Sequence, residues 1–363
     1  MSRITSDFLR VVSILAVLAI HATGTCEWRF HQEHAYASAA FLGVILNQLC
    51  RFSVPLFVLL SGFSLASREK TRGPLEPLRF YRDRLYRIGL PYLVWTVVIL
   101  LERHQLRLVS LSAGQPFLPA LGVDLQNLGH YLFQEGADYH FYFFAIILEC
   151  YLVFPLLQRL RRPWILGAFL TLHLAACYPL YLVQSGFSSL GLPLPSSFVL
   201  LFVFYFYAGM RLAEEPERLR GLILRLGTPG WLALAAAWAG AVLSEYVFLS
   251  YRTPSPAFYD HFQRITVMGY ALCVWALVVC QNARITRAFS TAPARRNLAL
   301  LAAWSFSVFI FHTRILRGLE KTPLRAHFFL LLPCLWIASF SLVGLFERWI
   351  RGPRVLRRVL GLP

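Results

Sequence analysis

The amino-acid sequence predicts an all-α, polytopic integral membrane protein, a bundle of about ten transmembrane helices with both termini in the cytoplasm. Of the 363 residues, 57% are apolar and only 15% are charged, and the mean hydropathy is +0.56. Soluble domains carry about 25% charged residues, so this composition favours the membrane class. We expect residues 1–363 to form a single membrane-embedded domain with no separate soluble domain.

Apolar stretches long enough to cross a bilayer as helices recur along the whole chain. The first stretch follows a basic residue, as in a signal peptide, but the many later stretches favour an uncleaved anchor. The second contains Arg51 and Pro55, so we expect a kink in it. The longest connection, 103–138, is interpreted as an outer loop with a short interfacial helix. The predicted spans are residues 8–24, 40–67, 86–102, 139–158, 163–184, 196–213, 229–249, 262–282, 298–315 and 326–347.

The distribution of Lys and Arg predicts the orientation of the bundle. The loops on the side of both termini carry 25 of the 35 Lys and Arg residues, and the opposite loops carry nine. Basic residues accumulate on cytoplasmic loops, so both termini are predicted to be cytoplasmic. The net charge of +17 is then explained by basic loops that face anionic lipid.

Several other kinds of site are not indicated by the sequence. No basic stretch is interleaved with stacking aromatic residues, so we do not expect nucleic-acid binding. The seven Cys residues form no CxxC pair and the His residues are scattered, so neither a disulfide framework nor a metal site is expected. Ser61 lies in no GxSxG motif, and Ser61-Gly62 is expected at a packed helix crossing instead.

The first predicted helix carries two ionisable residues, Arg10 and His21, eleven positions apart. A helix turns about 100° per residue, so the two share one face and lie about 16 Å apart along the axis. An ionisable group deep in an apolar span is costly and usually faces a cavity or a partner. Histidine can take a proton from a hydroxyl or carry an acyl group. The alternative is a structural histidine bonded to a neighbouring carbonyl.

Four later segments complete a pattern that begins with Arg10 and His21. Together, in this order and placement, they resemble the acyltransferase-3 family of bacterial membrane acyltransferases, particularly its members that O-acetylate surface polysaccharides. The resemblance covers essentially the whole chain. The segments are Phe52–Phe57 followed by Ser61-Gly62-Phe63, Phe80–Ile88 with its RxxR pair, Tyr139–Phe143 continuing to Tyr151 and Pro155, and Ser305–Ser307 continuing to Phe311 and His312.

The resemblance implies transfer of an acyl group, usually acetyl, from cytoplasmic acetyl-CoA to a sugar hydroxyl at the outer face of the bacterial inner membrane. Acetyl-CoA or another acyl-CoA is then the donor substrate, with no metal. The expected partners are membrane lipid, acyl-CoA and a glycan or lipid-linked sugar acceptor.

We assign Arg10, Arg84 and Arg87 to the phosphates of CoA, because arginine forks bind phosphate well. For Arg84 and Arg87 the alternative is a purely topological role, since other basic residues surround them. We assign catalysis to His21, Glu149 and His312. His312 lies toward the outer end of its predicted span and could instead be an interfacial histidine.

We assign the acceptor to Arg51, His140, Tyr142, Arg314 and Arg317. Arg51 and Glu149 each lie about ten residues from the outer end of their predicted spans, roughly 15 Å deep. A structural ion pair between them is the alternative. Arg314 and Arg317 are expected in a short outer loop, where basic residues are disfavoured. They are interpreted as a site for an anionic acceptor or, alternatively, for lipid headgroups.

A different function class also fits a bundle with polar residues in mid-membrane. A carrier that exports or flips a glycan or lipid without acyl transfer would contain such residues too. A sensor or scaffold is a third possibility. The RxxR segment with Arg10 favours the enzyme, because a glycan carrier has no need of a phosphate-binding cluster at the inner face.

Overall fold

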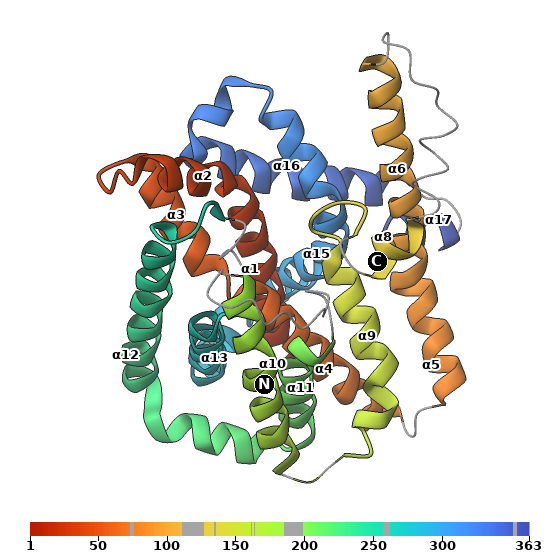
Figure 1. Ribbon diagram of the computed structural model, residues 1–363. Helices are drawn as coiled ribbons and strands as arrows, with labels where there is room; N and C mark the ends of the chain where they lie inside the picture. The colour runs from red at the N-terminus through yellow and green to blue at the C-terminus, as the bar shows by residue number, and fades with distance from the viewer. Residues whose placement is uncertain are drawn as a thin grey trace.

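The computed structural model describes residues 1–72, 76–110, 127–133, 136–160, 162, 164–184, 199–256, 262–350 and 354–362. These residues form helices and no strand, so the all-α prediction is confirmed for them (Figure 1). In chain order the helices are α1 (Arg3–Ala22), α2 (Gly24–Glu33), α3 (Ala39–Cys50), α4 (Ser53–Arg72), α5 (Pro77–Arg84), η1 (Leu85–Gly89), α6 (Leu90–Ser110), α8 (Leu128–Phe133), α9 (Tyr142–Leu157), α10 (Trp164–Gln184), η2 (Val199–Leu201), α11 (Val203–Glu214), α12 (Pro216–Ser250), α13 (Ile265–Cys280), α14 (Asn282–Ala288), α15 (Ala292–Leu319), η4 (Pro323–Ala326), α16 (Phe328–Trp349) and α17 (Arg354–Val359).

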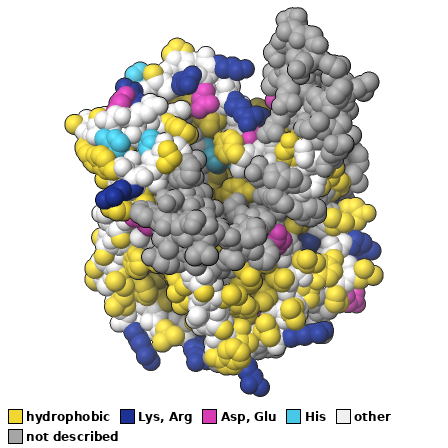
Figure 2. Space-filling model, in the orientation of Figure 1, with side chains coloured by type: hydrophobic (Ala, Val, Ile, Leu, Met, Phe, Trp, Pro, Cys, Tyr) yellow, Lys and Arg dark blue, Asp and Glu magenta, His cyan; other side chains and the backbone are white. Residues whose placement is uncertain are grey.

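Several helical segments are long and apolar enough to cross a membrane. In the described part of the chain there are 6 of these, or 7 if α13 and α14, which are bent by 61°, count as one span. α9 and the start of α10 are shorter apolar helices. Figure 2 shows hydrophobic side chains over much of the lower half of one face, with Lys and Arg along its lower edge and in its upper part. The chain is therefore a multi-pass membrane protein; ten spans and cytoplasmic termini stay predictions.

The second predicted span is interrupted between α3 and α4, which together still count as one candidate span, Ala39–Glu69. α3 ends at Cys50 and α4 begins at Ser53, so Arg51 and Phe52 lie between two helices. Pro55 is the third residue of α4, where its missing N–H costs nothing because no intrahelical acceptor exists there. The break leaves Arg51 buried inside the bundle rather than along a continuous helix.

The predicted crossing at Ser61-Gly62 is also confirmed. A Cβ atom on Gly62 would lie 2.0 Å from the carbonyl oxygen of Phe206, and one on Gly209 would lie 1.9 Å from that of Leu59. Each glycine therefore lets the backbone of the facing helix approach closely. This reciprocal contact holds α4 against α11.

α1 lies in the middle of the bundle, and this places its side chains next to several other helices (Figure 1). It contacts α3, α4, α15 and α16. The indole Nε1 of Trp336 on α16 donates a hydrogen bond to the carbonyl of Leu15, 3.1 Å away. Because helices surround α1, residues from distant parts of the sequence can meet at His21.

Some helix ends differ from the predicted ones. α9 begins at Tyr142, so His140 precedes the helix instead of lying within the fourth span. The expectation that Arg314 and Arg317 lie in a loop is wrong, since α15 continues to Leu319. Cationic side chains suit the last turns of a helix, where the macrodipole is negative. Of the predicted outer loop, residues 111–126 lie outside the described residues, while α8 lies near its end.

Candidate active site

His21 is the next-to-last residue of α1, and hydrogen bonds fix that end of the helix. Thr23 donates its hydroxyl to the carbonyl of Ala19 at 2.7 Å. Asn47 on α3 donates its amide Nδ2 to the carbonyl of Ile20 at 3.0 Å and to the Thr23 hydroxyl at 3.2 Å. The terminal carbonyls of a helix lack intrahelical donors, so these bonds satisfy groups that would otherwise be unpaired in an apolar environment.

Three histidines from separate parts of the chain meet at this helix end. The ring centroid of His312, on α15, lies 5.0 Å from that of His21 and 5.0 Å from that of His140. The His21 and His140 centroids are 6.4 Å apart. The structure thus brings together the two histidines predicted to be catalytic and the one predicted to bind the acceptor. His312 is fully buried inside the bundle.

The protonation of the two buried histidines follows from their surroundings. The Nδ1 atom of His312 lies 2.8 Å from the carbonyl oxygen of Phe309, which can only accept, so Nδ1 carries the hydrogen. Its Nε2 and both ring nitrogens of His140 have no hydrogen-bond partner among the described residues. Burial holds the pKa of His140 well below its usual range, and the nearby His312 and His21 lower it further.

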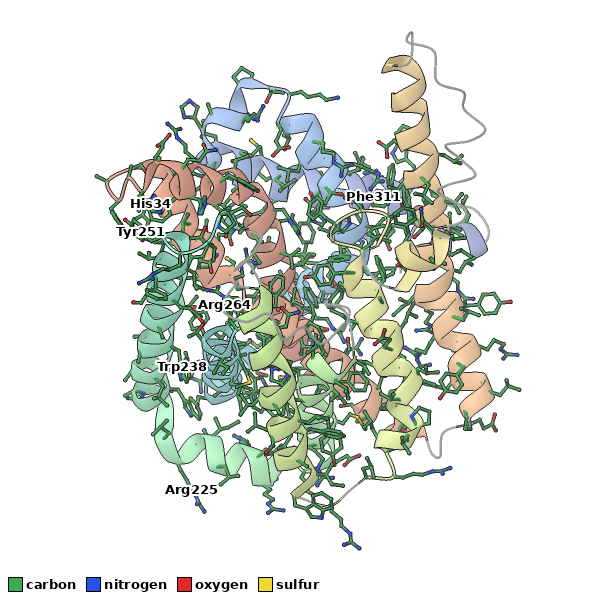
Figure 3. The ribbon with its side chains drawn as sticks, in the orientation of Figure 1. His34, Arg225, Trp238, Tyr251, Arg264 and Phe311 are labelled. Atoms are coloured by element: carbon green, nitrogen blue, oxygen red, sulfur yellow. The ribbon has the colours of Figure 1, made fainter. Side chains whose placement is uncertain are left out.

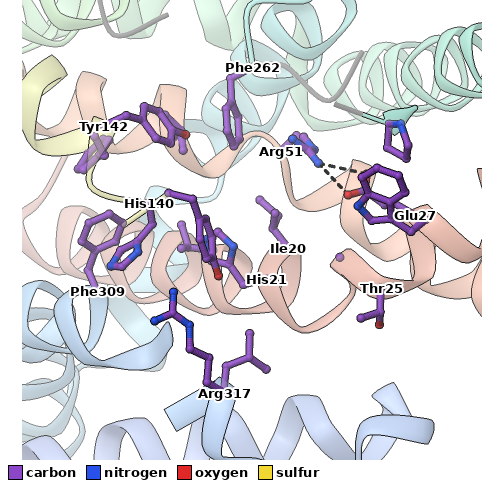
Figure 4. A pocket seen from close by; sticks show the side chains of 18 of the residues that line it. Ile20, His21, Thr25, Glu27, Arg51, His140, Tyr142, Phe262, Phe309 and Arg317 are labelled. Atoms are coloured by element: carbon purple, nitrogen blue, oxygen red, sulfur yellow. Dashed lines mark hydrogen bonds and ion pairs between the residues drawn. The ribbon is translucent and has the colours of Figure 1, made fainter. Parts of the chain in front are cut away.

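A cavity of about 560 Å³ opens beside these histidines (Figure 4). His21 and His140 lie on one side of it, and Arg51 and Glu27 lie on another. Its wall is otherwise largely apolar and aromatic, as in most small-molecule sites. The remaining lining residues are Val17, Ile20, Gly24, Thr25, Trp28, Val54, Tyr139, Tyr142, Phe143, Pro256, Phe262, Gln263, Phe309, Leu316, Arg317 and Glu320.

The alternative that Arg51 pairs with Glu149 is wrong. The Nη2 atom of Arg51 lies 3.2 Å from Oε1 of Glu27, and both side chains are almost completely buried. Glu149 instead accepts the backbone N–H of Val199 at 2.7 Å. Sequence reasoning missed Glu27, because residues between the first two spans were interpreted as a loop. No local feature of the sequence around Glu27 indicates that it meets Arg51.

The Arg51–Glu27 pair belongs to a larger buried polar network. Gln48 donates its Nε2 hydrogen to Oε1 of Glu27 at 2.8 Å and accepts a hydrogen bond from Nη2 of Arg264. Arg264, labelled in Figure 3, is fully buried, and its Nη1 lies 3.6 Å from Oε2 of Glu245. These contacts join α2, α3, α12 and the start of α13 behind the cavity wall.

A second carboxylate missed by sequence reasoning, Asp138, compensates the basic end of α15. Its Oδ1 accepts a hydrogen bond from Nη2 of Arg317 at 2.8 Å, and its Oδ2 lies 3.9 Å from Nη1 of Arg314. Arg314 also pairs with Glu102 at 3.2 Å. Asp138 itself is 1% exposed, two residues before His140. These pairs tie the segment that carries His140 to α15.

A basic cavity of about 220 Å³ lies at the other end of α1. It is lined by Arg10, Arg84 and Arg68, so two of the three predicted phosphate ligands meet there. Arg10 donates a hydrogen bond to Oγ of Ser64 at 2.5 Å and pairs with Asp7 at 3.4 Å. The remaining lining residues are Phe57, Leu60, Ser61, Ser64, Leu65 and Tyr151.

An apolar cavity of about 160 Å³ lies between the basic cavity and the histidine cavity. It shares Arg10 with the basic cavity and shares Phe143 and Phe309 with the histidine cavity. The three cavities therefore follow one another from Arg10 to His21 on α1.

A family model described as an acyltransferase domain, acyltransferase-3, matches residues 4–348. The chain belongs to the acyltransferase-3 family. Comparison with curated proteins and with solved structures finds no match. The match covers nearly the whole chain, and with the apolar helices it identifies a membrane acyltransferase.

Not every assigned residue lies at a cavity of this acyltransferase. Arg87 is exposed on η1 and lines none of the three cavities described above. Glu149 and Arg314 line none of them either. Arg51, His140, Tyr142 and Arg317 do line the histidine cavity. His312, although it touches His21, lines none of the three cavities either.

Proposed function

We propose that this acyltransferase moves an acyl group, acetyl first of all, from acyl-CoA to a sugar hydroxyl of a cell-surface glycan or lipid-linked precursor in the bacterial cell membrane. The single observation that carries the proposal is the row of adjoining cavities along α1. A basic cavity, a narrow apolar cavity and a larger cavity with histidines match the phosphates, the pantetheine arm and the reacting groups of such a donor.

The arginines of the basic cavity are proposed to bind the CoA phosphates. Arg84 lies over the rings of Phe80 and Tyr151, at 5.4 and 5.7 Å from their centroids, and these contacts hold its guanidinium at the cavity. Arg10 is held by Asp7 and Ser64. A guanidinium positioned in advance binds phosphate without losing further side-chain entropy.

His21 is proposed to be the catalytic base. It takes the proton of the acceptor hydroxyl, the hydroxyl oxygen forms a bond to the thioester carbonyl carbon, and the carbon–sulfur bond then breaks. The proton on His21 passes to the leaving CoA thiolate, so the base is regenerated. Attack by the His21 nitrogen itself, with an acyl-histidine that the hydroxyl then cleaves, uses the same geometry. Among the described residues His21 makes ring contacts only, which leaves its nitrogens available.

His312 and His140 are proposed to support His21 as neutral groups. His312 lines none of the three cavities, but its ring lies 5.0 Å from that of His21 and its Nε2 has no hydrogen-bond partner among the described residues, so it would act on His21 rather than on the substrate. His140 lines the cavity and can orient the acceptor hydroxyl. Arg51, Tyr142 and Arg317 would contact other parts of the acceptor.

The test is acyl transfer by the purified protein in nanodiscs with labelled acetyl-CoA and candidate glycans. We expect His21→Ala to lower kcat about 10²–10⁴-fold, the range of a lost general base. The control is His327→Ala, which removes an exposed histidine outside the three cavities. Normal turnover by the His21 variant would refute the catalytic assignment, and trapping an acyl-histidine would identify the two-step route.

A further inference from the structure

One face of α4 forms a wall of the basic cavity. Its residues on that face recur every three or four positions, which is the spacing of one side of a helix. The last of them, Arg68, follows Ser64 by one turn of the helix. Ser64 donates its hydroxyl hydrogen to the carbonyl of Leu60 at 2.6 Å and accepts the hydrogen bond from Arg10. The residues of this face are Phe57, Leu60, Ser61, Ser64, Leu65 and Arg68.

The basic cavity gathers three guanidinium groups from three helices. Arg10 belongs to α1, Arg68 to α4 and Arg84 to α5, and none of the described residues that line the cavity is acidic. The Nε atom of Arg84 is buried and has no hydrogen-bond partner among the described residues. Three cationic groups around a cavity of about 220 Å³ favour an anionic ligand with more than one negative charge.

The basic cavity adjoins the apolar cavity directly. The linings of the two cavities share Arg10, Phe57, Ser61 and Tyr151. In CoA the pantetheine arm is joined to the diphosphate, and the 3′-phosphate lies farther away, beyond the ribose. A donor whose arm occupies the apolar cavity therefore brings its diphosphate, and not its 3′-phosphate, into the basic cavity.

We propose that Arg10, Arg68 and Arg84 form a diphosphate subsite, so that the acyltransferase recognises the diphosphate of acyl-CoA and not its 3′-phosphate. This inference rests on the proposed function, because it assumes that the pantetheine arm occupies the apolar cavity. The diphosphate of CoA carries two negative charges and several oxygens, which suits arginine forks that approach from different helices. The adenosine and its 3′-phosphate then lie outside the cavity, where solvent screens the charge.

Titration calorimetry with the purified protein in phosphatidylcholine nanodiscs tests the subsite. It measures Kd for CoA, for dephospho-CoA, which lacks the 3′-phosphate, and for pantetheine, which lacks all three phosphates. For the wild type we expect CoA and dephospho-CoA to differ less than about fivefold, because a phosphate exposed to solvent gains little from nearby charges. Pantetheine should bind about a hundredfold or more weaker, because at least two charge-assisted contacts are lost.

The variant Arg68→Gln separates the diphosphate from the 3′-phosphate. We expect it to weaken the binding of CoA and of dephospho-CoA alike, each about tenfold or more, because both probes lose the same charge-assisted contact. The matched control is Arg82→Gln, which removes an exposed cation of α5 that lines none of the three cavities. This control should change each Kd less than about fivefold.

Each outcome has a distinct meaning. If Arg68→Gln weakens CoA but not dephospho-CoA, Arg68 binds the 3′-phosphate and the inference is wrong. If it weakens neither, while the wild type binds CoA, the subsite is wrong and the proposed function still stands. A wild type that binds no CoA would refute the proposed function itself. If Arg68→Gln does not fold, Arg68→Lys decides, since it keeps the charge but loses the bidentate fork and should weaken both CoA and dephospho-CoA.

Discussion

Replacing Glu27 by glutamine tests whether the buried ion pair holds the cavity wall together. Arg51 places Nη2 at 3.2 and 3.3 Å from the two carboxylate oxygens of Glu27. The two side chains are 2% and 5% exposed. The substitution keeps the shape of the side chain and an oxygen that can accept the hydrogen bond from Gln48, but it removes the negative charge. The substitution therefore removes one buried negative charge that lies next to the Arg51 guanidinium.

The expected loss of stability follows from that geometry. Breaking a buried ion pair from one side costs about 3–5 kcal/mol. Arg51 keeps its hydrogen bonds to Oδ1 of Asn47, at 2.9 and 3.1 Å, so the lower value, about 3 kcal/mol, applies here. For a chain of this length, that loss corresponds to a decrease in Tm of about 4 °C.

Helix α2 itself supplies the matched control. Arg29 and Glu33 form an ion pair at 3.0 Å, but their side chains are 67% and 46% exposed. Exposed pairs four residues apart in a helix contribute about 0.3–0.5 kcal/mol, so Glu33→Gln should lower Tm by less than 1 °C. Thermal unfolding of both variants in the same detergent gives the comparison. If Glu27→Gln lowers Tm no more than Glu33→Gln does, the buried pair does not stabilise the bundle as argued.

Four further outcomes are expected. Asp138→Asn should lower kcat about tenfold or more, because it frees the segment that carries His140, and Asp138→Glu should restore part of the loss. Arg84→Ala should raise the apparent KM for acyl-CoA about ten- to hundredfold, the value of one charge-assisted contact, whereas Arg87→Ala should change it much less. Since burial lowers the pKa of His140, Tm should be constant above about pH 6.5 and fall below it, and His140→Asn should flatten that acid limb. A cysteine at Glu76 should resist labelling from outside intact cells, because that segment is predicted to be cytoplasmic.

Local periodicity explains why the core of the candidate site could be predicted. Arg10 and His21 belong to one helix, so their common face follows from about 100° per residue alone. The structure places Arg10 at the basic and apolar cavities and His21 at the histidine cavity. The crossing at Gly62 was predictable for the same reason, since it depends on residues close in sequence.

Pairings between distant segments could not be predicted in this way. Depth counted from the ends of straight spans placed Arg51 level with Glu149, and such counting cannot show which helices are neighbours. α2 turns back after His21 and carries Glu27 into the bundle, where it meets Arg51 at the break between α3 and α4. Nothing within either segment encodes that meeting. It depends on the packing of the whole bundle.

The basic residues at the end of α15 were correctly expected to need acidic partners. The partners in the structure differ from the ones inferred from the sequence. Basic residues are disfavoured on the outer side of a membrane, so we expected their positive charge to be balanced by an anionic acceptor or by lipid headgroups. In the structure, carboxylates of the chain itself, those of Asp138 and Glu102, pair with these arginines. Arg317 is the member of this cluster that lines the histidine cavity, and 48% of its side chain is exposed. An anionic acceptor would have to share Arg317 with Asp138, and the carboxylate of Asp138 would repel it. The anionic acceptor stays a prediction, and we propose that hydrogen bonds rather than net charge orient the reacting sugar hydroxyl at this position.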